Sequence, residues 1–222
     1  MDFNTQKWDD LYKNANSLAR YPHEQLVTFA MKNFPRGGKI LDLYCGAGRH
    51  MKFLAENGFK AYGCDVSEEG LLRCKNFLKE YDMKAEELSL SNGSIIPFDS
   101  DFFDGLFSIG SLMYGTKEQI EQNAKEIHRV LKKGAKAYLN LRSTKDYCHI
   151  NGKHISKYEV IIDEKDETRP AFMENGMRVY QIDEDEARRI YIGFSNFTCD
   201  SIRVTYENNT YARDNLIIVL TK

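Results

Sequence analysis

Two glycines and one aspartate have a spacing that is typical of a ligand-binding site. Gly46 and Gly48 follow a short apolar run, Lys39–Leu43, and a glycine turn at that place lets the backbone approach a ligand closely, because no side chain intervenes. Asp65 ends a second apolar run. It lies 65 − 46 = 19 residues after Gly46, near the roughly 20 expected for an acid that accepts both hydroxyls of a ribose. The combination predicts a site for a ribose-containing ligand.

A dinucleotide-binding site would use the same glycine turn and the same acidic residue. Its GxGxxG fingerprint has a third glycine where this chain has Met51, and no pyrophosphate-binding helix start follows. Glycines at a strand-to-helix turn also occur for plain geometry. The aspartate in register favours ligand binding over plain geometry, and Met51 makes an NAD-dependent oxidoreductase the weakest functional hypothesis.

Alternating apolar runs and helical patterns must position these residues. We expect strands at 39–43, 60–65, 84–88, 103–109 and 135–141. We expect helices at 49–56, after an N-cap at Ser67, and from the capping box of Thr116 and Gln119 to Gly134, with Leu131 on the buried face. Parallel strands joined by helices predict a doubly wound α/β fold, because the crossovers cover both faces of the sheet.

The remaining segments extend this core within a single domain, residues 1–222. Residues 1–35 are expected to form a helical cover over the sheet's edge, and residues 36–141 the ligand-binding core. Residues 142–180 break the pattern and are interpreted as an inserted cap after the fifth strand. Residues 181–222 resume with a helix and two strands, 201–206 and 216–220, which makes a mostly parallel seven-stranded sheet.

Composition restricts the class of protein and its partners. The chain is 42% apolar and 29% charged, as in an ordinary globular domain. A net charge of −2, from 31 Lys and Arg against 33 Asp and Glu, gives no general attraction to nucleic acid or an anionic membrane. The five cysteines show no zinc spacing, so no metal is expected. No long apolar segment is present, which predicts a cytoplasmic protein. The sequence gives no indication of oligomeric state.

Three segments, in order, carry a resemblance to a known family. These are ILDLYCGAGRHMKFLAENGFKAYGCDVS from Ile40, IIPFDSDFFDGLFSIGSLMYG from Ile95, and EIHRVLKKGAKAYLNL from Glu126. They resemble the ordered motifs of class I S-adenosylmethionine (SAM)-dependent methyltransferases of the small-molecule type. The resemblance implies SAM as cofactor and a methyl-transfer activity.

The resemblance also implies a set of cofactor-binding residues. For the methionine part they are Asp42, Tyr44, Cys45, Gly46, Gly48 and Ser108; for the adenosine, Asp65, Val66, Asn92 and Gly93; and from the amino-terminal cover, Tyr12, Arg20 and Tyr21. Arg20 or Tyr21 would hold the carboxylate of SAM. The chain departs from the family at Tyr44, where the first glycine is usual, and at Asn92, where relatives often have aspartate.

Motifs that the chain lacks narrow the class of methyl acceptor. The chain lacks the Asn/Asp-Pro-Pro-aromatic motif of base-methylating relatives after the fourth strand, and it has no Pro-Cys pair. A nitrogen or oxygen of a small molecule is therefore expected. Acceptor-site candidates are Trp8, Tyr114 and Arg142, with Tyr12, Arg20, Tyr21 and His23 also considered. Cation–π contacts and arginine–anion pairs are the chemistry they offer, although the aromatic residues could equally pack the leading helices.

Catalysis of methyl transfer can rest on positioning, so a general base is optional. His149 and His154 in the insertion are conceivable bases, and solvated loop histidines are the alternative. No catalytic residue is identified. A catalytically silent SAM-binding regulatory partner is therefore kept as a second hypothesis.

Overall fold

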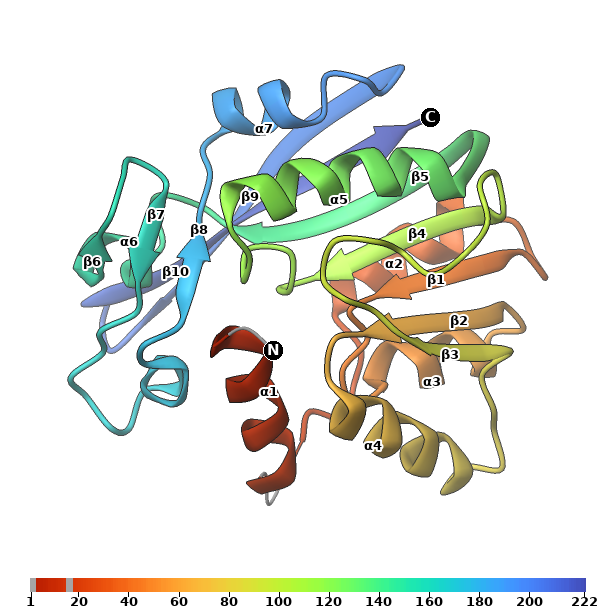
Figure 1. Ribbon diagram of the computed structural model, residues 1–222, viewed down its shortest axis with the longest axis horizontal. Coiled ribbons are helices and arrows are strands. Elements are labelled where there is room, and N and C mark those ends of the chain that lie inside the picture. The colour runs from red at the N-terminus through yellow and green to blue at the C-terminus, as the bar shows by residue number, and fades with distance from the viewer. Residues whose placement is uncertain (1–2, 15–17) are drawn as a thin grey trace.

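The main sheet has parallel strands at its centre and an antiparallel pair at one side. The computed structural model describes residues 3–14 and 18–222. Within them the sheet has seven strands in the order β3-β2-β1-β4-β5-β10-β9, and only β5–β10 and β10–β9 pair antiparallel (Figure 1). The strands are β1 Lys39–Leu43, β2 Lys60–Asp65, β3 Glu87–Leu90, β4 Phe103–Ile109, β5 Leu131–Arg142, β9 Asn196–Tyr206 and β10 Tyr211–Thr221. The doubly wound, mostly parallel seven-stranded sheet is as predicted.

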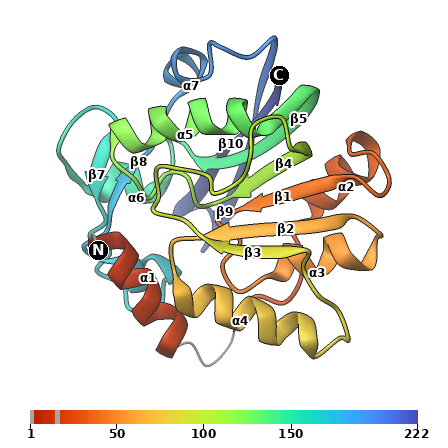
Figure 2. The ribbon, with the colours of Figure 1, turned by 45° about the vertical axis from the view of Figure 1, so that its right-hand side comes forward.

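Helices cover both faces of this sheet (Figure 2). They are α2 Glu24–Asn33, α3 Arg49–Glu56, α4 Glu68–Lys79, α5 Lys117–Val130 and α7 Glu184–Ile190. A further helix, α1 Phe3–Asn14, is not among those that cover the faces. Successive side chains of a strand point to opposite faces. Leu41 and Leu43 therefore join the core under α5 and α7, whereas Ile40 joins the core under α2, α3 and α4. Continuous apolar strands are typical of a sheet buried on both faces.

Side-chain caps fix where the crossover helices begin. The Ser67 hydroxyl accepts a hydrogen bond from the Gly70 amide at the start of α4. Thr116 and Gln119 form a reciprocal capping box at the start of α5. Both caps satisfy amides that have no partner inside a helix, so the helices start immediately after the loops that line the site.

The part of the chain between β5 and α7 forms a small second sheet. It is antiparallel, with the order β6-β7-β8. Its segments are α6 Tyr147–Asn151, β6 Lys153–His154, β7 Glu159–Ile161, the 3₁₀ helix η1 Pro170–Glu174 and β8 Arg178–Tyr180. Val160, Met177 and Val179 are buried in a separate apolar cluster, against which Trp8 of α1 packs. We refer to residues 143–182 as the insert.

Residues 1–35 were expected to form a helical cover over one edge of the sheet. The two leading helices do not lie together there. Leu26 and Ala30 of α2 are buried in the core on the sheet's face. The first helix, α1, lies instead beside α4 and against the insert, near the carboxyl ends of the central strands (Figures 1 and 2). None of the helices in the described ranges is long and apolar enough to cross a membrane.

Four strands have bounds that differ from those expected. Leu131, placed on the helix by periodicity, is the first residue of β5, and Gly134 lies within that strand. The third strand is Glu87–Leu90 rather than 84–88. Both final strands begin five residues earlier than expected, at Asn196 and Tyr211, because their first residues pair across the hairpin although they are largely polar.

The contact between α2 and the sheet predicts the effect of one substitution. A Cβ added at Gly105 would lie 2.4 Å from Cδ1 of Phe34, inside the packed core. Gly105→Ala is therefore expected to lower the free energy of unfolding by about 1–3 kcal/mol through overpacking, as measured by urea denaturation. Gly193→Ala is the control, since no atom lies within 4 Å of its added Cβ. Equal stability of the two variants would contradict this packing.

Candidate functional site

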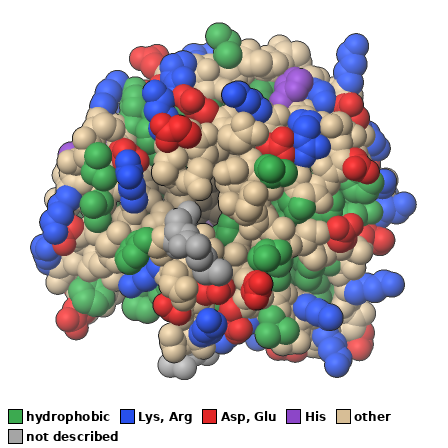
Figure 3. All heavy atoms as spheres, viewed as in Figure 1, with side chains coloured by type: hydrophobic (Ala, Val, Ile, Leu, Met, Phe, Trp, Pro, Cys, Tyr) green, Lys and Arg blue, Asp and Glu red, His purple; other side chains and the backbone are tan. Residues whose placement is uncertain are grey.

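A cavity of about 560 Å³ opens at the carboxyl ends of the central strands. Figure 3, which has the same view as Figure 1, shows a hollow near the middle of the surface. Its walls come from the loop after β1, the ends of β2, β4 and β5, the hairpin β9–β10, α1 and η1. Ligands of open α/β sheets bind at this edge, where neighbouring strands lead in opposite directions. The cavity is therefore the candidate site.

The loop after β1 forms one wall and depends on unusual backbone conformations. Tyr44, Gly46 and Gly48 have φ of 65°, 52° and 88°. A Cβ on Gly46 would lie 2.3 Å from the Tyr12 hydroxyl, and one on Gly48 would lie 2.5 Å from Sγ of Cys74. The two glycines are thus required both for φ and for space. Cys45 lines the cavity from the same loop.

Tyr44 adopts the left-handed conformation without filling the cavity. Its hydroxyl lies 2.9 Å from Oδ1 of Asn123 and 3.2 Å from the carbonyl oxygen of Gly93. Asn123 in turn donates from Nδ2 to the same Gly93 carbonyl. These bonds hold the tyrosine in a backbone conformation that favours glycine, and they tie the turn at Gly93 to α5.

Asp65 faces the cavity from the end of β2. Its Oδ2 accepts from the Gly46 amide at 2.8 Å and its Oδ1 accepts from the Ser67 amide at 2.9 Å. Burial raises the pKa of Asp65 to about 6, although these backbone hydrogen bonds oppose the shift. Val66 and Gly93 line the cavity next to it. A carboxylate with free lone pairs at this position can accept hydroxyl donors from a ligand.

Five residues predicted for the cofactor are not on the cavity wall. They are Arg20, Tyr21, Asp42, Asn92 and Ser108. Arg20 forms an ion pair with Glu80 at 2.5 Å, and Tyr21 is 85% exposed. Oδ1 of Asn92 accepts the amides of its own turn, Ser94 and Ile95. The structure thus directs Arg20 and Asn92 to protein partners.

Asp42 and Ser108 lie buried beneath the cavity. Neither Oδ2 of Asp42 nor Oγ of Ser108 has a hydrogen-bond partner among the described residues. Oδ2 of Asp42 is 3.8 Å from Nδ1 of His50, and burial raises the pKa of Asp42 well above its usual value. These groups support the floor of the site from below rather than lining it.

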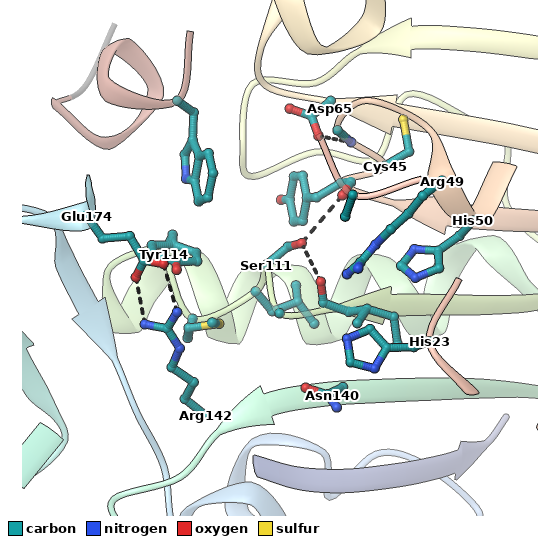
Figure 4. Close-up of a pocket in the computed structure, with 18 of the residues that line it drawn as sticks. His23, Cys45, Arg49, His50, Asp65, Ser111, Tyr114, Asn140, Arg142 and Glu174 are labelled. Atoms are coloured by element: carbon teal, nitrogen blue, oxygen red, sulfur yellow. Dashed lines mark hydrogen bonds and ion pairs between the residues drawn. The ribbon is translucent and has the colours of Figure 1, made fainter. Parts of the chain in front are cut away.

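The far end of the cavity contains the aromatic and charged groups predicted for an acceptor. Trp8 packs edge-on against Tyr114 with ring centroids 5.0 Å apart, and Tyr12 stacks on Trp8 at 5.9 Å. The guanidinium of Arg142 binds Glu174 of η1 through two hydrogen bonds of 2.7 and 2.9 Å (Figure 4). Arg142 is therefore already neutralised by a side chain of the insert.

Several lining residues were absent from the predicted site. Arg49 points into the cavity toward Ser111, beside His50 (Figure 4), and it makes no ion pair with a described residue. His23, one of the residues considered from the sequence for the acceptor site, lines the wall near His50. Burial, followed by the charge of Arg49, lowers the pKa of both histidines. Further additions include Asn140, Glu174, Ile202, Val204, Tyr206, Arg213 and Asn215. His149 and His154, the conceivable bases, are not on this wall.

Comparison with known proteins shows a similarity to methyltransferases. Residues 40–134 match the family described as a methyltransferase domain. YqeM of Bacillus subtilis, whose methyltransferase name is provisional, is 32% identical over 119 residues, which are 52% of this chain and 47% of YqeM. Demethylmenaquinone methyltransferase of Alkalihalophilus pseudofirmus is 30% identical over 131 residues, 57% of this chain and 54% of that protein. The chain thus spans about half the length of these curated relatives.

A solved structure shows the same fold. The SAM-dependent methyltransferase of Methanosarcina mazei superposes with a TM-score of 0.69 at 16% identity, over 90% of this chain and 98% of that one. Residues 40–134 thus match a methyltransferase domain, the chain has the fold of a SAM-dependent methyltransferase, and these similarities indicate S-adenosylmethionine as the cofactor. A 23S rRNA (uracil(747)-C(5))-methyltransferase of Pyrococcus abyssi also matches, at 35% identity over 68 residues, 31% of this chain and 15% of that protein. The relatives therefore point to no single class of acceptor.

The ion pair of Arg142 and Glu174 predicts a large effect on stability. The two side chains are only 11% and 12% exposed, so Glu174→Ala leaves a buried guanidinium without its partner. We expect the free energy of unfolding to fall by about 3–5 kcal/mol in urea denaturation. Glu184→Ala removes an exposed pair with Arg188 and should cost about 1 kcal/mol or less. Similar losses in both variants would show that the first pair is not buried.

Proposed function

We propose that the protein transfers a methyl group from SAM to a nitrogen or oxygen of a small-molecule acceptor. The observation that carries the proposal is one continuous cavity of about 560 Å³, with the glycine loop and Asp65 at one end and the Trp8–Tyr114–Arg142 group at the other. This volume is in the range of small-molecule sites. The two ends offer different chemistry, as a cofactor and an acceptor require.

The residues on the wall fit the cofactor. Asp65 would accept the ribose hydroxyls, Val66 and Gly93 would flank the adenine, and the loop Cys45–Gly48 would leave room for the methionine part. Arg49 would bind the carboxylate, in place of Arg20 and Tyr21, because its guanidinium is directed into the cavity next to this loop. When bound, SAM supplies an electrophilic methyl group on its sulfonium.

The chain's own contribution to catalysis is positioning and exclusion of water. Trp8 and Tyr12 of α1 cover the cavity, and such cover aligns two reactants and removes solvent. A neutral amine needs no base. For a hydroxyl acceptor, His23 would accept the proton, because its lowered pKa keeps the imidazole neutral at pH 7.

A nucleic-acid acceptor is less well supported by the surface around the cavity. Lys and Arg side chains alternate with Asp and Glu on this face, and no basic stripe leads to the hollow (Figure 3). Nucleic-acid sites rely on clustered positive charge to neutralise phosphates. The mixed charge favours a small molecule.

Cofactor binding and turnover test the proposal in two steps. Calorimetric titration with SAM and S-adenosylhomocysteine (SAH) should show binding, and binding of neither at millimolar concentration would refute a methyltransferase site. SAH release is then measured with fractionated small metabolites and, in parallel, with total RNA. Turnover only with RNA would refute the small-molecule acceptor. Binding without turnover in any fraction would support the silent regulatory partner instead.

The pKa of Asp65 predicts a pH dependence of cofactor affinity. An ionised carboxylate accepts ribose hydroxyls in stronger, charge-assisted bonds than a protonated one. Since the pKa is about 6, SAH should bind about tenfold more weakly at pH 5 than at pH 7.5. In Asp65→Asn, affinity should be lower and this pH dependence should disappear. Retention of the same dependence in the variant would assign it to another group.

A further inference from the structure

The hairpin β9–β10 forms one wall of the cavity through a single face. In the strand register Ile202 lies opposite Asn215, and Val204 lies opposite Arg213. Asn215 also lies opposite Arg142 of β5. All five residues line the cavity. The antiparallel side of the sheet therefore presents a continuous surface of three strands to whatever fills the far end.

One part of this surface is apolar and uncovered. Val204 is 44% exposed and Tyr206 is 37% exposed, while Ile202 is partly buried. Tyr206 is held by stacking on Tyr211, with ring centroids 5.0 Å apart. An apolar strip inside a cavity binds the apolar part of a ligand, because the ligand removes it from water.

The charges on the wall leave one arginine without a role. Among the described residues the wall carries three arginines, Arg49, Arg142 and Arg213, and two acids, Asp65 and Glu174. Arg142 and Glu174 neutralise each other. Asp65 lies at the opposite end, on β2, and the carboxylate of SAM accounts for Arg49 in the function proposed above. Arg213 then remains.

Arg213 has no acidic partner among the described residues, although it is half-buried. The neighbouring Asp214 points to the other face of the hairpin. There it accepts from the Ser143 hydroxyl and pairs with Arg203 at 3.4 Å. A guanidinium held in a wall without a counter-charge is suited to a carboxylate or phosphate of a ligand.

We propose that the acceptor is a small amphipathic anion, whose carboxylate or phosphate binds Arg213 and whose apolar part packs on Ile202, Val204 and Tyr206. The inference rests on the proposed function, because it assigns Arg49 to the cofactor. It adds the chemical class of the acceptor and the wall that selects it. Arg213 is a binding residue in this arrangement, and it takes no part in the methyl transfer itself.

The test uses simple probes on the protein saturated with SAH. Phenylacetate and phenyl phosphate carry the anion, phenylacetamide is the neutral match, and phenethylamine is the cationic match. In calorimetric titration we expect at least one anionic probe to bind tenfold or more tightly than phenylacetamide. Whether phenylacetate or phenyl phosphate binds more tightly separates a carboxylate acceptor from a phosphate acceptor.

Two variants test whether the β9–β10 wall causes the preference for anionic probes. Arg213→Gln should reduce the affinity of the anionic probe to that of phenylacetamide while SAH affinity stays unchanged, which also shows that the variant is folded. Arg203→Gln, on the opposite face of the same hairpin, should keep the preference. Equal binding of all probes, no binding of either anion at millimolar concentration, or a preference that survives Arg213→Gln would overturn the inference. Failure of SAH to bind the unmodified protein would instead refute the proposed function.

Discussion

The hydrogen bond from the Gly46 amide to Oδ2 of Asp65 fixes the ends of two neighbouring strands at the point where the cavity begins. The other oxygen of the same carboxylate accepts from Ser67, at the start of α4. Ser67 also donates its hydroxyl to Asp9 of α1. One buried carboxylate thus organises the glycine loop, the next helix and, through Ser67, the helix that covers the site. Its raised pKa follows from that burial.

The cover of the site is connected to both parts of the molecule. Asn4 of α1 donates to the carbonyl oxygens of Tyr114, after β4, and Arg178, in the insert. In the middle of α1, Asp9 accepts from the hydroxyl of Ser67 at the start of α4, and Trp8 packs against the apolar cluster of the insert. Since α1 contacts the main sheet's loops and the insert together, it joins the two parts of the molecule over the cavity.

The sequence predicted those parts whose signals are local. β1, β2 and β4 have the expected bounds because buried central strands are continuous apolar runs. The first half of β10, Tyr211–Asn215, was missed because its outward face is polar, and it is polar because it lines a cavity. Arg20 was predicted for the cofactor, but Glu80, sixty residues away, binds it. Nothing local distinguishes Arg20 from Arg49, since only the tertiary structure shows which guanidinium has found a protein partner.

The two halves of the sheet differ in what they can offer a ligand. Parallel strands end at one edge, so their loops converge and build a site from backbone and one carboxylate. Antiparallel β9 and β10 run past that edge, so side chains along their length, such as Val204 and Arg213, form a wall. Substitutions along this wall can change size and charge without disturbing the glycine loop. The buried pair of Arg142 and Glu174 stands between the two halves and joins β5 to the insert at the far end of the cavity.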